Sequence, residues 1–594
     1  MINILITSKL TDSLPHDFDS YQLLSMRRLG KDDILTARKR GIKRYYLSTL
    51  DDKDSQCFYK EFDAFWDNVV GHFPKDHFFW RNIVSSKIQE WERSLVYFML
   101  FLYELNHRAD ENVRLIFIPA SIEEAAIVRS WGEKNGWAVV QRGASVGEVL
   151  RKIRQEIENS LRFLRFVLIH VRRKIFSPAG RVDIPSHLHK KKFLVISLFY
   201  PFSFQNGRYF DPFFKELHNY LIKEGCHCQY LSDCLTPPSK EIKDKIEGCH
   251  EVRINTPYGL IGWCTLFAAF LRVFCRRVRF HKPIFFMGCD FASLIQWNAR
   301  RFQFDFNISS EIFYRAVLNI TKKVDFDRLL VIFEGNVFER ACIQGFRQNS
   351  GKQINAYSHA VIFSLLSLKL YMSDREKDLR PEPDYYLCSG DREKNLLLNI
   401  GKRDPSRIIA TCAFRNIPRQ KKSNPEAILI ALDGMWSSVM LLDWLIGQKD
   451  ILNGYKVRIR SHPNVPLRNI LQQSLYPLPE NFIVSEDSLG EDIGRAKCVI
   501  YRHTSVGMQA ILSDIPAIHL RVDTPLGGDP MEELTVGKWS ASNPGELRHA
   551  LGEALNLTEE QSRDLFDRAK EYVEQYFSPP NEERLSNFIF SGGE

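Results

Sequence analysis

The stretch VIFEGNVFERACIQGFRQNSGKQINAYSHAVIF, residues 331–363, decides how the middle of this chain is expected to fold. It opens with an apolar run that ends at Glu334, continues with a segment of helical character, and closes with a second apolar run that ends at His359. Strand, helix and strand in succession are typical of a parallel α/β sheet. Such sheets bind ligands beyond the carboxyl ends of their strands, so Glu334 and His359 are candidate site residues.

The length and composition indicate an ordinary globular protein of several domains. The chain has 594 residues, of which 44% are hydrophobic and 26% are charged, and this is too long for a single core. Its net charge of +9 favours an anionic ligand or a membrane surface as partner. We do not expect the protein to bind nucleic acid. The start MINILITSKLTD has the pattern of a strand rather than of a signal peptide, and the cysteines are scattered, so we expect a cytoplasmic protein.

Four regions follow from the alternation of strand and helix patterns. We expect an N-terminal α/β domain over 1–145, a basic helical connector over 146–190, a first Rossmann-like lobe over 191–420 and a second over 421–594. The boundaries fall where the pattern breaks, as in the linker PRQKKSNPEA that precedes the last region.

Two segments combine apolar runs with arginines: residues 149–180 and the stretch LIGWCTLFAAFLRVFCRRVRF that begins at Leu260. Each apolar run is shorter than the ~20 residues that a bilayer span needs. Two interpretations stay open. In the first, both segments are interdomain helices with the apolar side in the core and the arginines in solvent. In the second, both dock peripherally on the anionic face of the inner membrane.

Polar side chains follow three strands that the fourth region is predicted to contain. Because parallel strands end at one edge of a sheet, we expect these clusters to converge. A helix start after the third cluster also offers free backbone N–H groups to a phosphate, although a plain helix cap would use the same residue types. The residues are Asp433 and Gly434, then His462 and Pro463, then Arg502, His503, Thr504 and Ser505.

These motifs resemble those of a known group of enzymes. RSHP, HTS followed by DIPAIHL, and the acidic-glycine turn LDG resemble the C-terminal domain of GT-B glycosyltransferases that use CMP-sugars, namely bacterial sialyltransferases and capsule Kdo transferases. Glu334, Glu339, AYSH and PDYYLCSG are similar to a narrower group, the surface-carbohydrate biosynthesis proteins. The resemblance spans residue 191 to the C-terminus. It implies an α/β, GT-B-like fold of two doubly wound Rossmann-like domains facing across a cleft, with the last helix packed back on the first lobe.

The resemblance also implies roles for individual residues. His462, Pro463 and Gly434 would hold the nucleotide, Thr504 and Ser505 would bind phosphate oxygens, and Arg502 or His503 would add charge. Asp433 would be base or nucleophile and Glu334 the second carboxylate. The acceptor side would be lined by His359 and by two residues of the loop QNGRYFDPF, Arg208 and Tyr209.

The implied reaction transfers an acidic sugar, Kdo or a sialic-type nonulosonate, from CMP to a cell-surface polysaccharide or lipid-linked glycan. No cofactor and no metal ion are expected, since the chain has no Gly-x-x-x-x-Gly-Lys-Ser/Thr loop and residues 421–594 contain no Asp-x-Asp motif for a metal–nucleotide complex. Two rivals stay open. A CDP-glycerol-type polyol-phosphate transferase would use a similar fold and similar histidine positions. A non-catalytic scaffold of a surface-polysaccharide assembly complex is favoured by two departures from the family pattern, Leu432 and Gln509. Glu334 itself has an alternative role, as a cap of the helix that follows it.

Overall fold

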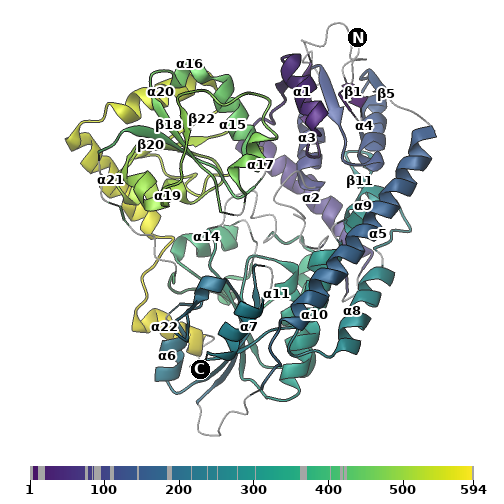
Figure 1. The fold of residues 1–594 in the computed structure, drawn as a ribbon, viewed down its shortest axis with the longest axis vertical. Coiled ribbons are helices and arrows are strands. Elements are labelled where there is room, and N and C mark those ends of the chain that lie inside the picture. The colour runs from purple at the N-terminus through teal and green to yellow at the C-terminus, as the bar shows by residue number, and fades with distance from the viewer. Residues whose placement is uncertain are drawn as a thin grey trace.

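The computed structural model contains three parallel sheets, formed by residues 4–142, 192–410 and 427–541 (Figure 1). The α/β class expected from the sequence is therefore confirmed. The structure describes residues 4–591 except 8, 11–20, 74–77, 83–84, 86–94, 108–112, 143–145, 183–189, 216, 237–238, 250–251, 277, 302, 362–370, 400, 402, 415–418, 421–423, 436 and 464.

The second sheet has the strand order of a Rossmann fold. The chain enters at its centre with β6, moves outward through β9 to β10, and returns to the other side of β6 with β13, β14, β15 and β16. The direction of winding therefore reverses between β6 and β13, the place where such sheets bind ligands. The strands are β6 (Lys192–Phe199), β9 (His227–Cys234), β10 (Arg253–Asn255), β13 (Arg328–Ile332), β14 (Gln353–Ser358), β15 (Tyr385–Cys388) and β16 (Ile408–Ala410). The helices of this region are α6 (Leu217–Lys223), α7 (Lys240–Glu247), α8 (Trp263–Cys275), α10 (Gln303–Thr321), α11 (Val337–Asn349), α13 (Glu376–Leu379) and α14 (Asp391–Asn399).

The third sheet repeats this order, β19-β18-β17-β20-β21-β22, so its winding reverses between β17 and β20. Two Rossmann-like sheets in tandem confirm the GT-B-like architecture expected for the two lobes. The strands are β17 (Ala427–Ala431), β18 (Lys456–Arg460), β19 (Phe482–Val484), β20 (Ala496–Tyr501), β21 (Ala517–Leu520) and β22 (Lys538–Ala541). The helices are α15 (Ser438–Gly447), α16 (Lys449–Leu452), α17 (Leu467–Leu471), α18 (Leu489–Gly494), α19 (Val506–Leu512), α20 (Pro544–Leu555), α21 (Glu559–Glu574) and α22 (Glu582–Phe590).

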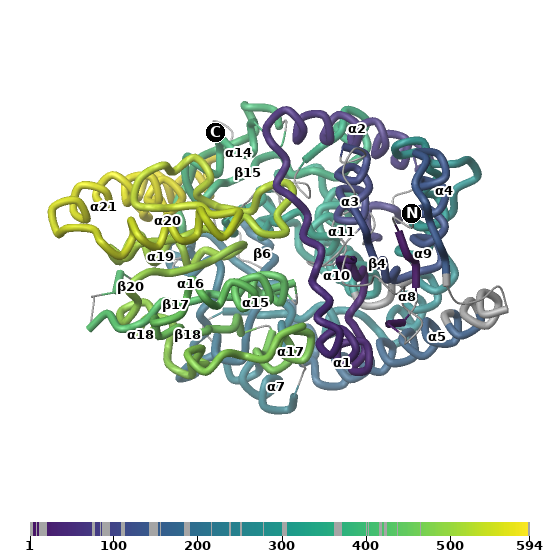
Figure 2. The backbone as a smooth tube through the Cα atoms, turned by 90° about the horizontal axis from the view of Figure 1, so that it is seen from above, coloured from purple at the N-terminus to yellow at the C-terminus, as the bar shows by residue number. Residues whose placement is uncertain are grey.

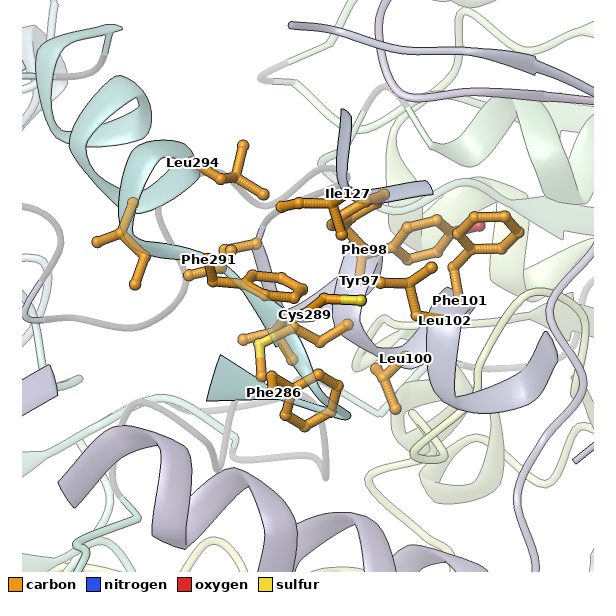
Figure 3. Close-up of a cluster of buried hydrophobic side chains, with 14 of the residues drawn as sticks. Tyr97, Phe98, Leu100, Phe101, Leu102, Ile127, Phe286, Cys289, Phe291 and Leu294 are labelled. Atoms are coloured by element: carbon orange, nitrogen blue, oxygen red, sulfur yellow. The ribbon is translucent and has the colours of Figure 1, made fainter. Parts of the chain in front are cut away.

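The N-terminal sheet, in the order β3-β2-β4-β1-β5, completes its core with a segment from the middle of the chain. Residues 278–299 pack among the aromatic side chains of α2 and α3 (Figure 3). The ring of Phe291 lies 5.9 Å from that of Phe98, and the ring of Phe286 lies 5.7 Å from that of Phe291. We predicted that all of 191–420 belongs to the second unit, and for this segment the prediction is wrong. The elements are β1 (Ile4–Thr7), β2 (Gln22–Ser25), β3 (Lys43–Arg44), β4 (Leu115–Ile118), β5 (Val139–Arg142), α1 (Lys31–Lys39), α2 (Asp52–Gly71), α3 (Leu95–His107), α4 (Ile122–Lys134), β11 (Phe285–Phe286), β12 (Cys289–Asp290) and α9 (Ala292–Arg301).

Buried polar contacts join the N-terminal unit to the third sheet. The side chain of Arg44 pairs with Asp443, and both are almost wholly buried. Asp523 accepts hydrogen bonds from the hydroxyl of Tyr97 at 2.6 Å and from the backbone N–H of Leu47 at 3.1 Å. Figure 2 shows the chain between α1 and α2 running along the unit that the third sheet forms.

The last helix, α22, crosses back to the second sheet as expected (Figure 1). Phe588 and Ile589 lie in the core beneath that sheet, where Phe588 contacts the ring of Tyr357. The hydroxyl of Ser591 accepts hydrogen bonds from Arg328 at 2.9 Å and from Asn355 at 2.8 Å. The C-terminus therefore helps to hold the two Rossmann-like units together.

The basic apolar segments form helices α5 (Val146–Ile175) and α8. In the described part of the chain, no helix is long and apolar enough to cross a membrane.

Candidate functional site

Glu334 and His359 form an ion pair at the carboxyl edge of the second sheet. Glu334 follows β13 and His359 follows β14, which are neighbouring strands. The Nε2 atom of His359 lies 3.2 Å from Oε1 of Glu334, and 14% and 28% of the two side chains are exposed. Because β13 borders the point where the winding reverses, this partly open pair lies where a ligand is expected.

The helix after Glu334 is capped by other residues. Asn336 is the N-cap of α11, and its backbone N–H donates to Oε2 of Glu339 at 2.8 Å. The backbone N–H of Glu334 donates to the same oxygen at 3.0 Å. Glu339 thus serves the helix start, while the side chain of Glu334 turns to His359 and to Asn336 Nδ2 at 3.3 Å. The alternative in which Glu334 is a helix cap is wrong.

Two buried carboxyl groups surround this pair. Burial, together with the nearby charge of Glu334, raises the pKa of Glu339 to about 7. Burial also raises the pKa of Glu393 to about 7, against the hydrogen bonds that its carboxylate accepts from Ser358 and Ser389. We did not predict Glu393 from the sequence. The signal was a serine at the end of the strand PDYYLCSG followed four residues later by an acid.

Two opposing effects act on the pKa of His359. Burial lowers its pKa, but the hydrogen bond to Glu334 and the charges of Glu334, Glu339 and Glu393 outweigh burial, so the pKa is raised above 6.5. His359 therefore keeps its proton nearer to neutral pH than a free histidine does. Its ring is held edge-on against Phe213, with centroids 4.6 Å apart.

In the third sheet, Asp433 and Arg502 form a buried ion pair across the switch point. Asp433 follows β17 and Arg502 follows the neighbouring β20. The Nη2 and Nε atoms of Arg502 lie 2.9 Å and 3.2 Å from Oδ2 of Asp433, and each side chain is 1% exposed. The other carboxylate oxygen accepts from Ser438 Oγ and from the backbone N–H of Met435. This placement corrects two expectations, because it leaves neither a base at Asp433 nor a phosphate ligand at Arg502 open to a substrate.

His503 is also enclosed. Its ring lies so close to Gly528 that a Cβ at that glycine would fall 2.0 Å from Cδ2 of the histidine. Burial, together with the charges of Arg502 and His519, lowers the pKa of His503 well below 6.5. A neutral, buried imidazole does not supply the positive charge that we expected His503 to contribute, and this expectation is corrected as well.

The remaining nucleotide-side residues lie partly open at the same edge. His462 follows β18, and its ring packs on Gly434, where a Cβ would lie 3.1 Å from Nδ1. A side chain at position 434 would therefore crowd the imidazole. Pro463 is exposed, and Thr504 and Ser505 are half-buried before α19, with Thr504 Oγ1 accepting from the backbone N–H of Val506 at 3.4 Å. The structure thus brings the acidic-glycine turn and the His-Pro tip together.

The two residues expected in the acceptor loop lie in different environments. Tyr209 is 9% exposed, packs on Tyr230, and donates its hydroxyl to Asp211 at 2.8 Å. It is a core residue, so its predicted place on the acceptor wall is corrected. Arg208 is exposed in the hairpin of β7 (Phe204–Gln205) and β8 (Arg208–Tyr209).

Contacts beyond β14 and β15 tie the edge of the second sheet to the third unit. Val361, two residues after His359, and Leu396 of α14 pack against the core around Tyr501 and Met508. Ser389 donates its hydroxyl to the carbonyl of Tyr576 at 3.0 Å, near the end of α21. Figure 1 shows α14 between the two units. The Glu334–His359 pair therefore lies on the side of the second sheet that meets the third.

The solved structures that resemble this protein do so only distantly. No family model and no curated protein matches the sequence. A UDP-GlcNAc 2-epimerase from Neisseria meningitidis bound to UDP-GlcNAc is 13% identical, with 67% of this chain and 98% of that chain covered and a TM-score of 0.37. The glycosyltransferase SnogD from Streptomyces nogalater is 13% identical, with 67% and 99% covered and a TM-score of 0.35. At these scores, the strand order and not the likeness defines the class of fold: tandem Rossmann-like lobes with a third α/β unit.

Proposed function

We propose that this protein is a glycosyltransferase of the GT-B type that uses a nucleotide-sugar donor. The main support for the proposal is that two sheet edges carry partly exposed polar side chains at corresponding positions. Glu334 and His359 lie partly exposed at the switch point of one sheet, and His462, Thr504 and Ser505 lie partly exposed at the corresponding edge of the next. In sheets of this order, ligands bind at those positions.

The donor that we propose is a CMP-linked acidic sugar, and the acceptor is a cell-surface polysaccharide or lipid-linked glycan. The order of the acidic-glycine turn, the His-Pro tip and the Thr-Ser pair along the chain supports this choice, because it resembles that of the CMP-sugar enzymes. The imidazole of His462 and the hydroxyls of Thr504 and Ser505 would donate hydrogen bonds to the phosphate, as preorganised donors do for developing negative charge.

Glu334 is the catalytic base in this proposal. Its carboxylate would take the proton of an acceptor hydroxyl while that oxygen forms a bond to the anomeric carbon, and the bond from this carbon to the CMP phosphate breaks. His359, protonated and 3.2 Å away, keeps Glu334 ionised and oriented. Because Asp433 is held by Arg502, one carboxylate rather than two faces the substrate, and this favours a single direct displacement. Asp433 becomes a positioning residue.

Ligand-induced thermal stabilisation tests the proposal. CMP should raise the melting temperature, since a ligand at about 100 times its Kd stabilises the native state by about 2.7 kcal/mol. UDP, GDP and CDP-glycerol should have little effect. His462→Ala should abolish the CMP shift, whereas Arg208→Ala, on an exposed hairpin, should keep it.

Other outcomes contradict the proposal in distinct ways. Stabilisation by UDP or by CDP-glycerol, but not by CMP, refutes the CMP donor and supports a different transferase. The absence of any nucleotide shift supports the scaffold alternative. An unchanged CMP shift in His462→Ala places the nucleotide away from the residues named above.

A further inference from the structure

Helix α5 carries a second apolar face that points to solvent. Its inner face packs on the core of the second unit through Phe163, Phe166 and Val167, and buried His170 lies 2.7 Å from the hydroxyl of Tyr258. At 3.6 residues per turn, six other apolar residues share an arc of about 80° on a different face. They are 52–64% exposed: Ile153, Ile157, Leu161, Leu164, Leu168 and Ile175.

Helix α8 extends this exposed apolar face. Trp263, Phe267, Leu271 and Phe274 recur every three or four residues and are 40–64% exposed. The two helices lie side by side, as Figure 1 shows, with the rings of Phe163 and Phe274 4.9 Å apart. At the other end, Nζ of Lys174 lies 6.0 Å from the centre of the Trp263 ring. We call the ten exposed residues of the two helices the apolar stripe.

Positive charge borders the apolar stripe from Leu161 onward, whereas Arg154, near its N-terminal end, pairs with Glu158 at 2.9 Å. By helical spacing, Arg154, Arg165 and Arg172 fall beside the stripe on α5, and all three are exposed. Residues 159–182 contain six Lys or Arg and no Asp or Glu, and so do residues 252–289. Ten exposed apolar residues on two adjacent helices also exceed the scattered single side chains that ordinary protein surfaces carry.

The interdomain alternative, in which the apolar side of both segments is in the core, describes the inner faces of the two helices but does not account for the apolar stripe. An amphipathic face rimmed by arginines matches the boundary between anionic headgroups and acyl chains, because the apolar side chains enter the boundary and the cations pair with the headgroups. We propose that the apolar stripe on α5 and α8 docks this protein on an anionic membrane surface. The proposal does not depend on the glycosyltransferase function.

Co-sedimentation of the full chain with lipid vesicles, without nucleotide, tests the docking. Vesicles of equal parts phosphatidylglycerol and phosphatidylcholine should bind the protein, and pure phosphatidylcholine should not. Leu164→Ser combined with Leu168→Ser should weaken the partition constant by about tenfold or more, since both side chains lose apolar burial. Arg165→Gln combined with Arg172→Gln should weaken it on the order of tenfold at low salt, and added salt should reduce binding of the unaltered protein.

The matched control is Leu35→Ser, which removes an equally exposed leucine from α1, away from the apolar stripe. It should bind anionic vesicles as the unaltered protein does. Equal binding by the Leu164/Leu168 variant and by this control overturns the proposal. So does a stripe variant that changes the protein from dimer to monomer in sedimentation velocity while vesicle binding stays intact, because the occupant is then a second copy of the chain.

Discussion

The guanidinium of Arg502 and the carboxylate of Asp433, 2.9 Å apart and 1% exposed, join β20 to β17 at the point where the third sheet reverses its winding. Each residue lies just beyond the end of its strand, and its side chain is buried from solvent. The pair therefore fixes the edge on which His462, Thr504 and Ser505 stand, and the following predictions start from it.

Breaking this pair should destabilise the third unit. Asp433→Ala leaves a buried, uncompensated guanidinium, which costs about 3–5 kcal/mol. Arg502→Met should cost a similar amount, and the double variant should be less destabilised than the sum of the two. Urea unfolding measures these costs. Glu426→Gln is the control, because its ion pair with Lys456 lies at the surface, with 42% and 41% of the two side chains exposed, and is worth about 0–1 kcal/mol. A loss for Asp433→Ala no greater than that of the control contradicts the structural role of the pair.

Removing the charge of Glu334 should lower the pKa of His359. In Glu334→Gln the ion-pair partner no longer offsets the burial of the imidazole, so the pKa of His359 should fall. NMR titration of protein labelled at histidine reports this, with His359→Gln identifying the resonance. The stability that protonated His359 contributes is present below pH 6.5 and is lost as the pH rises through the raised pKa. An unshifted titration in Glu334→Gln shows that the ion pair does not form.

The buried carboxyl of Glu393 should make stability fall with rising pH. Its pKa is about 7 in the native state, whereas that of an unperturbed glutamate is 4.5, so the native state binds the extra proton between these values. The contribution is full below pH 4.5 and is lost by pH 7 or above. Glu393→Gln keeps an acceptor for Ser389 but does not ionise, so its stability curve between pH 5 and 8 should be flatter than that of the unaltered protein. Parallel curves for the two proteins refute this assignment.

A methyl group at position 434 should disturb the nucleotide edge. In Gly434→Ala the new Cβ lies 3.1 Å from Nδ1 of His462, so the imidazole must move. We expect the thermal shift caused by CMP to fall while the free protein loses little stability. Gly552→Ala, in the middle of α20 with no atom near the added methyl, should instead stabilise by up to about 1 kcal/mol and keep the CMP shift. A full CMP shift in Gly434→Ala means that His462 does not touch the nucleotide.

The sequence by itself determined the alternation of strands and helices, the two Rossmann-like lobes and the strand ends that carry polar groups. These depend on local patterns: apolar runs of strand length, helix caps and the rule that parallel strands end at one edge. The convergence of Glu334 with His359, and of Gly434 with His462, followed from that rule. The return of α22 to the second sheet was expected from the resemblance.

Only the tertiary structure decided which of the polar side chains at the strand ends are exposed to solvent. Asp433, Arg502, His503 and Tyr209 have the residue types of a site, yet packing buries them, and burial depends on neighbours far away in the sequence. The same holds for residues 278–299, which complete the core of a sheet formed by residues 4–142. Helix α5 is a further example. Its two apolar faces cannot be told apart in the sequence, but in the structure one packs against the second unit and the other is exposed to solvent.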